Sequence, residues 1–306
     1  MTAALRLAYV VPTKDRPEDL SNLLDSLARQ TRMPDQIVIV DGGDMTVEHL
    51  VTRYAALPLD YVREYPPSLA RQRNAGMAAV RPDIVVAGYL DDDLILEPDA
   101  TERMAAFWEA ADPLVGGAAF NIMNQPRAAG GPFTRFFLMN GAAPGRMLPS
   151  GWPSQIPTVT ATIRTDWLYG GATMWRREVI RDYAYDEWFV GHGYGEDVDF
   201  SYRVSRRYTL YVVADARVLH MTRPIRLSSQ YTLGRQQVVN RLYFIRKAGG
   251  FSGVSVAWGM FGQLIVNLGA SLFHFDSAGA RRFAGNLAGF RDVVRGRMGQ
   301  IANFYK

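Results

Sequence analysis

The 306-residue sequence contains no cysteine, which excludes disulfide bonds and thiolate metal sites. A metal ion would need oxygen or imidazole ligands, and the chain has only four histidines. Residues 1–11 hold one arginine and a short apolar run, without the small-residue cleavage site of a secretory signal. We therefore expect this segment to be a first strand and the protein to be cytoplasmic.

Acidic residues are scarce in the last quarter of the chain. Residues 226–306 hold 11 Lys and Arg against two Asp, whereas the rest holds 23 basic and 28 acidic residues. The formal net charge of +4 therefore hides two regions of opposite charge, which predicts two different partners.

Strand and helix patterns alternate in the first half of the sequence. Short β-rich runs occupy residues 5–11, 36–40, 59–62 and 84–90, and helical spacing follows at Leu20–Leu27 and at 68–79. A further strand is expected at 209–213. Alternation of this kind predicts an α/β fold with a mainly parallel sheet covered by helices on both faces. Residues 125–154 mix Gly, Pro and Arg with aromatics, which is typical of a long functional or mobile loop.

Polar residues follow three of these strands, at the point where each strand ends. The first strand leads into Thr13, Asp15 and Arg16, the second into Asp41, and the fourth into Asp91-Asp92-Asp93. Ligands bind beyond the carboxyl ends of the strands in open parallel sheets. The sequence therefore predicts one site along this edge of the sheet.

The acidic run Asp91-Asp92-Asp93 is a candidate metal site. Residues i and i+2 share a face in an extended segment, so Asp91 and Asp93 can point the same way. Adjacent carboxylates resist joint ionisation unless a cation neutralises them, and Mg²⁺ or Mn²⁺ would do so. The alternative is a solvated acidic turn before the next helix, but the buried strand that precedes the run favours the metal ligand.

Other polar residues near these strand ends have two interpretations. Asp41 can accept a hydrogen bond from a nucleotide base, or it can be a simple turn residue before Gly42-Gly43. Arg71 and Asn74 lie three apart on one helix, which suits a diphosphate. An exposed helical arginine is more commonly only solvated.

A second acidic cluster lies at Glu196-Asp197, directly after Gly193-Tyr194-Gly195. A carboxylate at the mouth of a pocket can take a proton from an attacking hydroxyl. Acidic residues also stabilise helix N-termini, and both roles are compatible. Val198, Phe200 and Val204 predict the buried face of the helix that follows.

Seven segments resemble, in order, the inverting family 2 glycosyltransferases of the GT-A fold: VVPTKDRP, VIVDGG, LARQRNAG, YLDDDLILEPD, WLYGGATMWRREV, GYGEDVDFSYRV and VLH. The resemblance covers roughly residues 5–220. It implies a catalytic domain at residues 1–225 and a basic helical extension at 226–306. The implied donor is a nucleotide-sugar and the implied cofactor is Mg²⁺ or Mn²⁺.

The same resemblance implies roles for individual residues. Thr13, with Asp15 or Arg16, would lie near the nucleotide, Asp41 at the base and Asp91 near the ribose. Asp93 would bind the metal, with His220 as a further ligand. Asp197 would be the general base, supported by Glu196, and the departing nucleoside diphosphate would be stabilised by the metal. The remaining expected positions are Gly170 and Gly171 beside the donor sugar, Trp188 and His192 beside the acceptor, and Asp92 in the donor region without a defined role.

The pattern also separates this chain from other classes. Processive members of the family carry Gln-x-x-Arg-Trp after the base, whereas residues 236–242 read QQVVNRL without the tryptophan, which favours a single transfer. A nucleotidyltransferase would need a Gly-rich phosphate loop after the first strand, and VVPTKDRP is not such a loop. A non-catalytic nucleotide-sugar-binding component of a glycan assembly complex would need no base, so the presence of both YLDDD and GEDVD argues against it.

The basic extension predicts amphipathic helices. No Asp, Glu, Lys or Arg occurs in residues 248–275, but an apolar stripe at spacings of three and four, diluted by Ser, Gly, Gln and Asn, favours an amphipathic helix over a transmembrane span. Phe283, Leu287, Phe290 and Val294 form a second stripe among arginines. We expect these helices to bind an anionic membrane surface at the inner face of the cell membrane. The expected acceptor is a glycan or a lipid-linked sugar. A helical cap or homodimer interface is the alternative, and nucleic acid is not expected.

Overall fold

The computed structural model describes residues 5–125, 131–190, 193–273 and 276–298. Its internal contacts divide the chain into two units. Unit 1 comprises Met1–Arg127, Pro157–Glu187 and Glu196–Thr222, and unit 2 comprises Ala128–Ile156, Trp188–Gly195 and Arg223–Lys306. The chain passes to the C-terminal helices near the expected boundary, but two segments from the first 225 residues cluster with those helices.

Unit 1 is built on one mixed sheet of nine strands in the order β3-β2-β1-β4-β8-β6-β9-β5, with β7 paired to β9. The first four strands of that order are mutually parallel, β8 is antiparallel to both of its neighbours, and β6 and β9 are parallel. This is the expected α/β class. The strands are β1 (Leu7–Thr13), β2 (Gln36–Asp41), β3 (Leu59–Arg63), β4 (Val86–Leu90), β5 (Leu94–Leu96), β6 (Val115–Ile122), β7 (Ile163–Thr165), β8 (Ala172–Arg176) and β9 (Thr209–His220).

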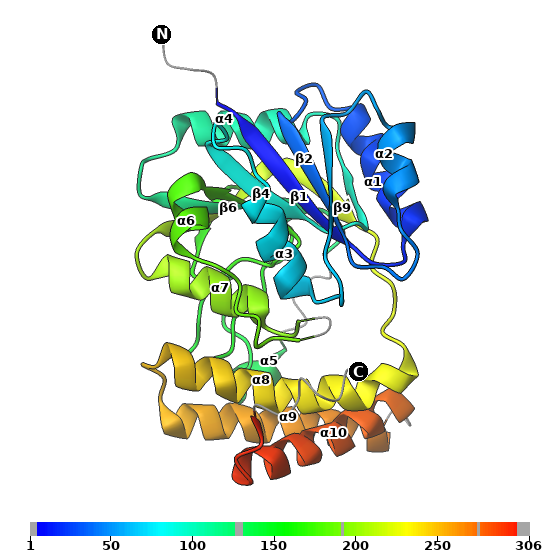
Figure 1. Cartoon of the computed structure of the whole chain (residues 1–306). Helices are drawn as coiled ribbons and strands as arrows, with labels where there is room; N and C mark the ends of the chain where they lie inside the picture. The colour runs from blue at the N-terminus through cyan, green and yellow to red at the C-terminus, as the bar shows by residue number, and fades with distance from the viewer. Residues whose placement is uncertain (1–4, 126–130, 191–192, 274–275, 299–306) are drawn as a thin grey trace. The chain divides into compact units, whose positions relative to one another are not determined.

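Helices cover both faces of this sheet, and every residue of β1 is buried as a result. Leu7, Tyr9 and Val11 belong to the core formed with the leucines of α1 and with Met104 and Trp108 of α4. On the other face α3 packs over β1 and β2 (Figure 1). The helices of unit 1 are α1 (Pro17–Ala28), α2 (Glu48–Arg53), α3 (Leu69–Ala78), α4 (Ala100–Ala110), α6 (Arg177–Asp182) and α7 (Glu196–Ser205).

Close packing of α3 depends on Gly76. A Cβ at this position would lie 2.2 Å from Cγ1 of Val10 and 2.7 Å from Cγ2 of Val40. The absence of a side chain therefore lets the helix approach the two strands whose ends carry Thr13 and Asp41. Figure 1 shows α3 lying across the strands in this region.

Unit 2 is helical. It contains α5 (Pro132–Phe136), the short η1 (Leu227–Ser229), α8 (Gln230–Ala248), α9 (Gly253–Phe273) and α10 (Ser277–Val294). The helix α10 packs against both α8 and α9 (Figure 1). Gly234 of α8 faces the Arg282 carbonyl of α10, where a Cβ would lie 2.1 Å from the oxygen. Small residues thus set the close approach of these two helices.

Candidate active site

Asp92 ties the end of β4 to the end of β1. The Thr13 hydroxyl donates to Oδ2 of Asp92 over 2.7 Å, and Nη1 of Arg16 donates to Oδ1 over 3.2 Å. Asp92 is 4% exposed, and burial raises its pKa to about 7 against the hydrogen bond from Thr13 and the charge of Arg16. Asp92, which had no defined role in the sequence analysis, therefore holds two strand ends together.

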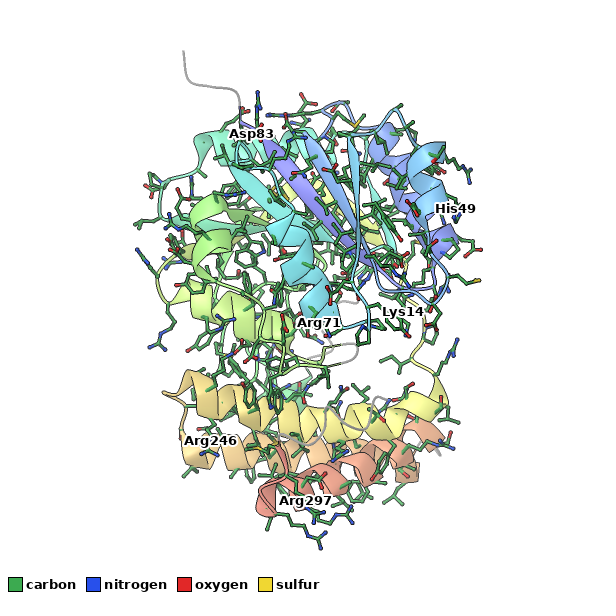
Figure 2. The ribbon with its side chains drawn as sticks, viewed as in Figure 1. Lys14, His49, Arg71, Asp83, Arg246 and Arg297 are labelled. Atoms are coloured by element: carbon green, nitrogen blue, oxygen red, sulfur yellow. The ribbon has the colours of Figure 1, made fainter. Side chains whose placement is uncertain are left out.

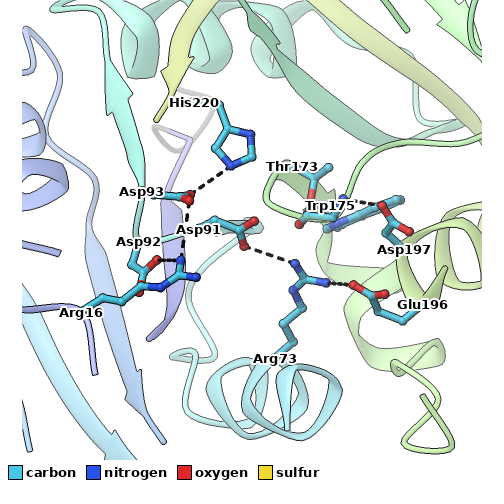
Figure 3. Close-up of polar contacts among 11 residues, drawn as sticks. Arg16, Arg73, Asp91, Asp92, Asp93, Thr173, Trp175, Glu196, Asp197 and His220 are labelled. Atoms are coloured by element: carbon cyan, nitrogen blue, oxygen red, sulfur yellow. Dashed lines mark hydrogen bonds and ion pairs between the residues drawn. The ribbon is translucent and has the colours of Figure 1, made fainter. Parts of the chain in front are cut away.

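Asp91, Asp93 and His220 form a group that could hold a metal ion, with one ligand atom from each residue within 4.8 Å of the others. The antiparallel pairing of β5 with β9 places His220 opposite Leu94, immediately after Asp93. Nε2 of His220 lies 3.0 Å from Oδ1 of Asp93 (Figure 3). Two carboxylates and an imidazole suit a divalent cation that accepts oxygen and nitrogen ligands. These three residues, here called the metal group, include both outer aspartates of the acidic run and the expected histidine.

Burial and neighbouring charges shift the pKa values of Asp93 and His220 in this group. Burial acts to raise the pKa of Asp93, but His220 and the Arg16 guanidinium outweigh it and hold that pKa below its usual value. Burial acts to lower the pKa of His220, but contact with Asp93 raises it overall. The carboxylate of Asp93 is therefore ionised at neutral pH, as a metal ligand requires.

Arg73 connects the metal group to the second acidic cluster. Its side chain is buried, and its Nη2 lies 3.2 Å from Oδ1 of Asp91 while Nη1 lies 2.9 Å from Oε1 of Glu196 (Figure 3). The guanidinium also lies over the ring of Tyr185, at 5.0 Å from its centroid. Arg73 is the central cation of the site.

The sequence pattern pointed to Arg71 and Asn74 as phosphate-binding residues, and not to Arg73, which lies between them. The side chain of Arg71 pairs with Glu64, and that of Asn74 bonds to both the N–H and the carbonyl of Tyr185. A three-residue spacing placed Arg71 and Asn74 on one face of α3. No local sequence pattern marks Arg73, because its importance depends on its burial in the folded protein.

Gly170 and Gly171 make room for the charged side chains. A Cβ on Gly171 would lie 1.9 Å from Oδ2 of Asp91, and one on Gly170 would lie 2.6 Å from Nη1 of Arg73. The N–H of Asp91 also donates to the Gly171 carbonyl over 2.7 Å. These two glycines, expected beside the donor sugar, therefore leave the space that Asp91 and Arg73 occupy.

Asp197 is held by backbone donors at the start of α7. Its Oδ1 accepts from the N–H of Val198 over 2.8 Å, and its Oδ2 accepts from the N–H of Gly170 over 3.2 Å. Burial raises its pKa, although the Arg73 charge and the two backbone N–H groups oppose the shift. Burial and Asp197 together raise the pKa of Glu196 to about 8, against the charge of Arg73.

Phe200 and Val204 form the buried face of α7 as expected, but Val198 is only partly buried. Asp199 and Ser201 are buried in its place. Their side chains have partners: Asp199 pairs with Arg203, and the Ser201 hydroxyl donates to the Asp197 carbonyl.

Asp41 organises the turn after β2. It is fully buried and accepts hydrogen bonds from the N–H groups of Gly43 and Val47 and from the Tyr61 hydroxyl, while Arg63 forms an ion pair with it over 3.1 Å. These contacts match the turn-residue interpretation of Asp41.

Asp15 stabilises the same turn from the end of β1. Its Oδ1 accepts from the N–H of Asp44 over 2.8 Å, and its backbone has a φ of 53°. Asp15 therefore supports the shape of the loop beside the strand ends.

Trp188 and His192 are the two residues expected at the acceptor. Trp188 belongs to unit 2, where its ring stacks on Tyr243 with centroids 3.7 Å apart. His192 lies outside the described residues. The Arg241 guanidinium, on the stretch that lacks the processive motif, lies 4.1 Å from the ring centroid of Trp152.

Comparison with known proteins gives the family. The model of glycosyl transferase family 2 matches residues 9–167. The uncharacterized glycosyltransferase YwdF of Bacillus subtilis is 32% identical over 109 residues, which are 35% of this chain and 40% of that protein. The amylovoran biosynthesis glycosyltransferase AmsE of Erwinia amylovora is 33% identical over 111 residues, 35% of this chain and 41% of that protein. The chain thus matches about two fifths of the length of these relatives.

Solved structures share the fold. A mannosyltransferase of Pyrobaculum calidifontis, in complex with GDP-Man and Mn²⁺, has a TM-score of 0.58 at 16% identity, covering 95% of this chain and 88% of that one. GalNAc-T7 with UDP, GalNAc and Mn²⁺ has a TM-score of 0.57 at 20% identity, covering 86% and 55%. At these identities the likeness concerns the fold alone. Together with the family match over more than half of the chain, it establishes that this protein belongs to glycosyl transferase family 2 and has the GT-A fold.

Proposed function

We propose that this protein transfers one sugar from a nucleoside-diphosphate sugar to an acceptor hydroxyl, with inversion at the anomeric carbon. One observation carries the proposal: buried Arg73 links Asp91 of the metal group to Glu196 beside Asp197. The site therefore has one group of acidic residues suited to bind a metal ion, which would contact the phosphates, and a second carboxylate suited to accept a proton. Direct displacement needs both of these functions at once.

Asp197 is the proposed general base. Backbone N–H groups of Val198 and Gly170 orient its carboxylate, and its raised pKa makes it a stronger base than an exposed aspartate. It would remove the proton from the acceptor hydroxyl as that oxygen attacks the anomeric carbon. Glu196 would contribute by holding Arg73 in place.

The opposite side of the site suits the leaving group. Asp91, Asp93 and His220 would hold Mg²⁺ or Mn²⁺, which when bound supplies a positive charge for the diphosphate. Arg16 lies at the edge of this group with its side chain 39% exposed, so its guanidinium can contact a phosphate. The two structural relatives are complexes with Mn²⁺ and a nucleotide or nucleotide-sugar, which supports this assignment.

The acceptor is proposed to be a glycan or lipid-linked sugar of the cell envelope. The relative named for amylovoran biosynthesis supports a surface-glycan role. The missing tryptophan after residues 236–241 supports transfer of a single sugar instead of synthesis of a polymer.

A panel of nucleotide-sugars, incubated with Mg²⁺ or Mn²⁺ and candidate glycan acceptors, tests the reaction. We expect one donor to turn over and proton NMR of the product to show the inverted anomer. A retained anomer would contradict the direct-displacement mechanism. Asp93→Ala should abolish metal-dependent nucleotide binding in calorimetry, and unchanged affinity would exclude Asp93 as a ligand.

A further inference from the structure

The helix α9 of unit 2 exposes most of the apolar stripe that its sequence predicts, although Phe251 and Ile265 of that stripe are only partly exposed. Five residues recur at helical spacing with exposed side chains, and they are here called the α9 stripe: Val254, Trp258, Phe261, Leu268 and Leu272. The exposed fraction is 83% for Val254, 49% for Phe261 and 59% for Leu272. A helix of a water-soluble domain normally turns such a stripe inward. The α9 stripe faces outward.

The opposite side of α9 is rich in small and polar residues, and it is this side that is buried. Gly262 lies against Phe137, Gly259 lies against Trp152, and Asn267 is 3% exposed. The side-chain N–H₂ of Asn267 donates to Oδ1 of Asn286 on α10 over 2.6 Å. Because these contacts fix the buried side, the helix cannot simply rotate to hide its stripe.

Aromatic side chains extend the apolar surface beyond α9. The indole N–H of Trp258 donates to the Phe136 carbonyl over 2.8 Å, and the rings of these two residues lie 5.2 Å apart. Phe133 and Phe136 of α5 are exposed, at 47% and 65%. A contiguous exposed surface of this kind marks a contact with a membrane or another protein.

The charge of unit 2 decides between these two contacts. Its sequence holds 14 Lys and Arg against two Asp, whereas the rest of the chain holds 20 basic and 28 acidic residues. The two aspartates are already ion-paired, Asp276 with Arg282 and Asp292 with Arg235. The unit is therefore strongly cationic around an apolar surface, which matches an anionic lipid headgroup layer over an acyl interior.

The exposed face of α10 combines both features on a single helix. Leu287 and Val294 are exposed, and so are Arg281, Arg291 and Arg295 of the same helix. Arginine side chains of this kind can reach phosphate while the apolar neighbours enter the interface. Figure 2 shows Arg246 and Arg297 at the surface of the helical unit.

We propose that unit 2 binds the surface of an anionic lipid bilayer through the α9 stripe and the exposed arginines of α10. Within the described residues one helix, Gly253–Leu272, is long and apolar enough to cross a membrane. Its buried Gln263 and Asn267 and its packing on α10 favour a position in the interface plane. This proposal does not depend on the transfer reaction.

Flotation of the full chain with phosphatidylcholine vesicles, with and without phosphatidylglycerol, tests the proposal. The protein should float with anionic vesicles and stay at the bottom with neutral ones, and alkaline carbonate should release it. Phe261→Ser/Leu272→Ser should lower the partition coefficient at least about tenfold, and Arg291→Gln/Arg295→Gln should lower it about 30-fold. The matched controls are Leu114→Ser and Arg29→Gln/Arg206→Gln, which alter exposed residues of unit 1 and should leave binding unchanged.

Several results would overturn the proposal. Absence of binding to anionic vesicles would do so directly, as would equal losses in the controls. If alkaline carbonate failed to release the protein from vesicles, α9 would be a transmembrane helix and not an interfacial one. The wild type could instead fail to bind vesicles and form a dimer in light scattering. If Phe261→Ser/Leu272→Ser were then monomeric, the surface would be an interface with a second copy of the chain. Nucleotide affinity measured on the same variants should stay unchanged, which separates this proposal from the proposed reaction.

Discussion

Removal of Arg73 tests whether the site depends on one buried cation. Arg73→Met keeps the aliphatic volume but deletes the charge that lies 2.9 Å from Glu196 and 3.2 Å from Asp91. The side chains of Arg73 and Glu196 are 2% and 5% exposed, so solvent cannot replace the lost partner. Removal of one member of a buried pair costs about 3–5 kcal/mol of unfolding free energy.

The pH dependence of this loss follows from Glu196. Burial raises its pKa from 4.5 to about 8 in the folded protein, so Glu196 can take up a proton below that pH. In the variant its pKa rises further because the Arg73 charge is gone. The difference in unfolding free energy between variant and wild type should therefore be ~3 kcal/mol at pH 7 and larger at pH 9, where the wild-type carboxylate is ionised.

Urea unfolding followed by tryptophan fluorescence at pH 7 and pH 9 measures both effects. Arg71→Met is the matched control, because Arg71 lies on the same helix and its pair with Glu64 is partly exposed. That control should lose less than about 1 kcal/mol. A loss for Arg73→Met no greater than the control, or one that does not grow with pH, would refute the central role of Arg73.

Three further predictions concern other residues of the site. Gly171→Ala places a Cβ 1.9 Å from Oδ2 of Asp91 and should weaken Mn²⁺ binding about 10–100-fold in calorimetry, whereas Gly131→Ala, with open space around its Cβ, should not; equal affinities would contradict the packing role. Thr13→Val removes the donor 2.7 Å from buried Asp92 and should cost about 1–3 kcal/mol in urea unfolding. Thr165→Val, whose hydroxyl has no hydrogen-bond partner among the described residues, serves as its control, and equal losses would argue against the Asp92 tie. Because burial raises the pKa of Asp197 and the base must be ionised, kcat/KM should fall tenfold per pH unit below that pKa. The acid limb should lie above the usual aspartate range, and a profile flat through pH 4 would exclude this assignment.

The sequence predicted the strands that end at the site because each is a compact run of β-branched or apolar residues. Residues 36–40 and 59–62 match β2 and β3 within a residue at each end. The strand β6 was not predicted, since its sequence VGGAAFNI has low β-propensity. Its glycines serve packing instead: a Cβ on Gly117 would lie 2.4 Å from the Trp175 ring.

Local sequence patterns could not predict contacts between segments that are distant in the sequence. The strand expected at 209–213 continues to His220, because a register shift between β6 and β9 at Phe120/Asn121 allows the pairing to resume. The importance of Arg73 depends on the approach of α3 to α7, which no spacing rule encodes. Similarly, helical periodicity identified the α9 stripe but could not tell which side of the helix would be buried.

Asp197→Asn tests the account most directly, because it removes the proposed base while it preserves the shape of the side chain. Donor and metal affinities in calorimetry should stay at wild-type values. Sugar transfer should fall about 10²–10⁴-fold, which is the usual contribution of a general base. Transfer by this variant at the wild-type rate would contradict the assignment of Asp197 and with it the proposed division of the site into a metal group and a base.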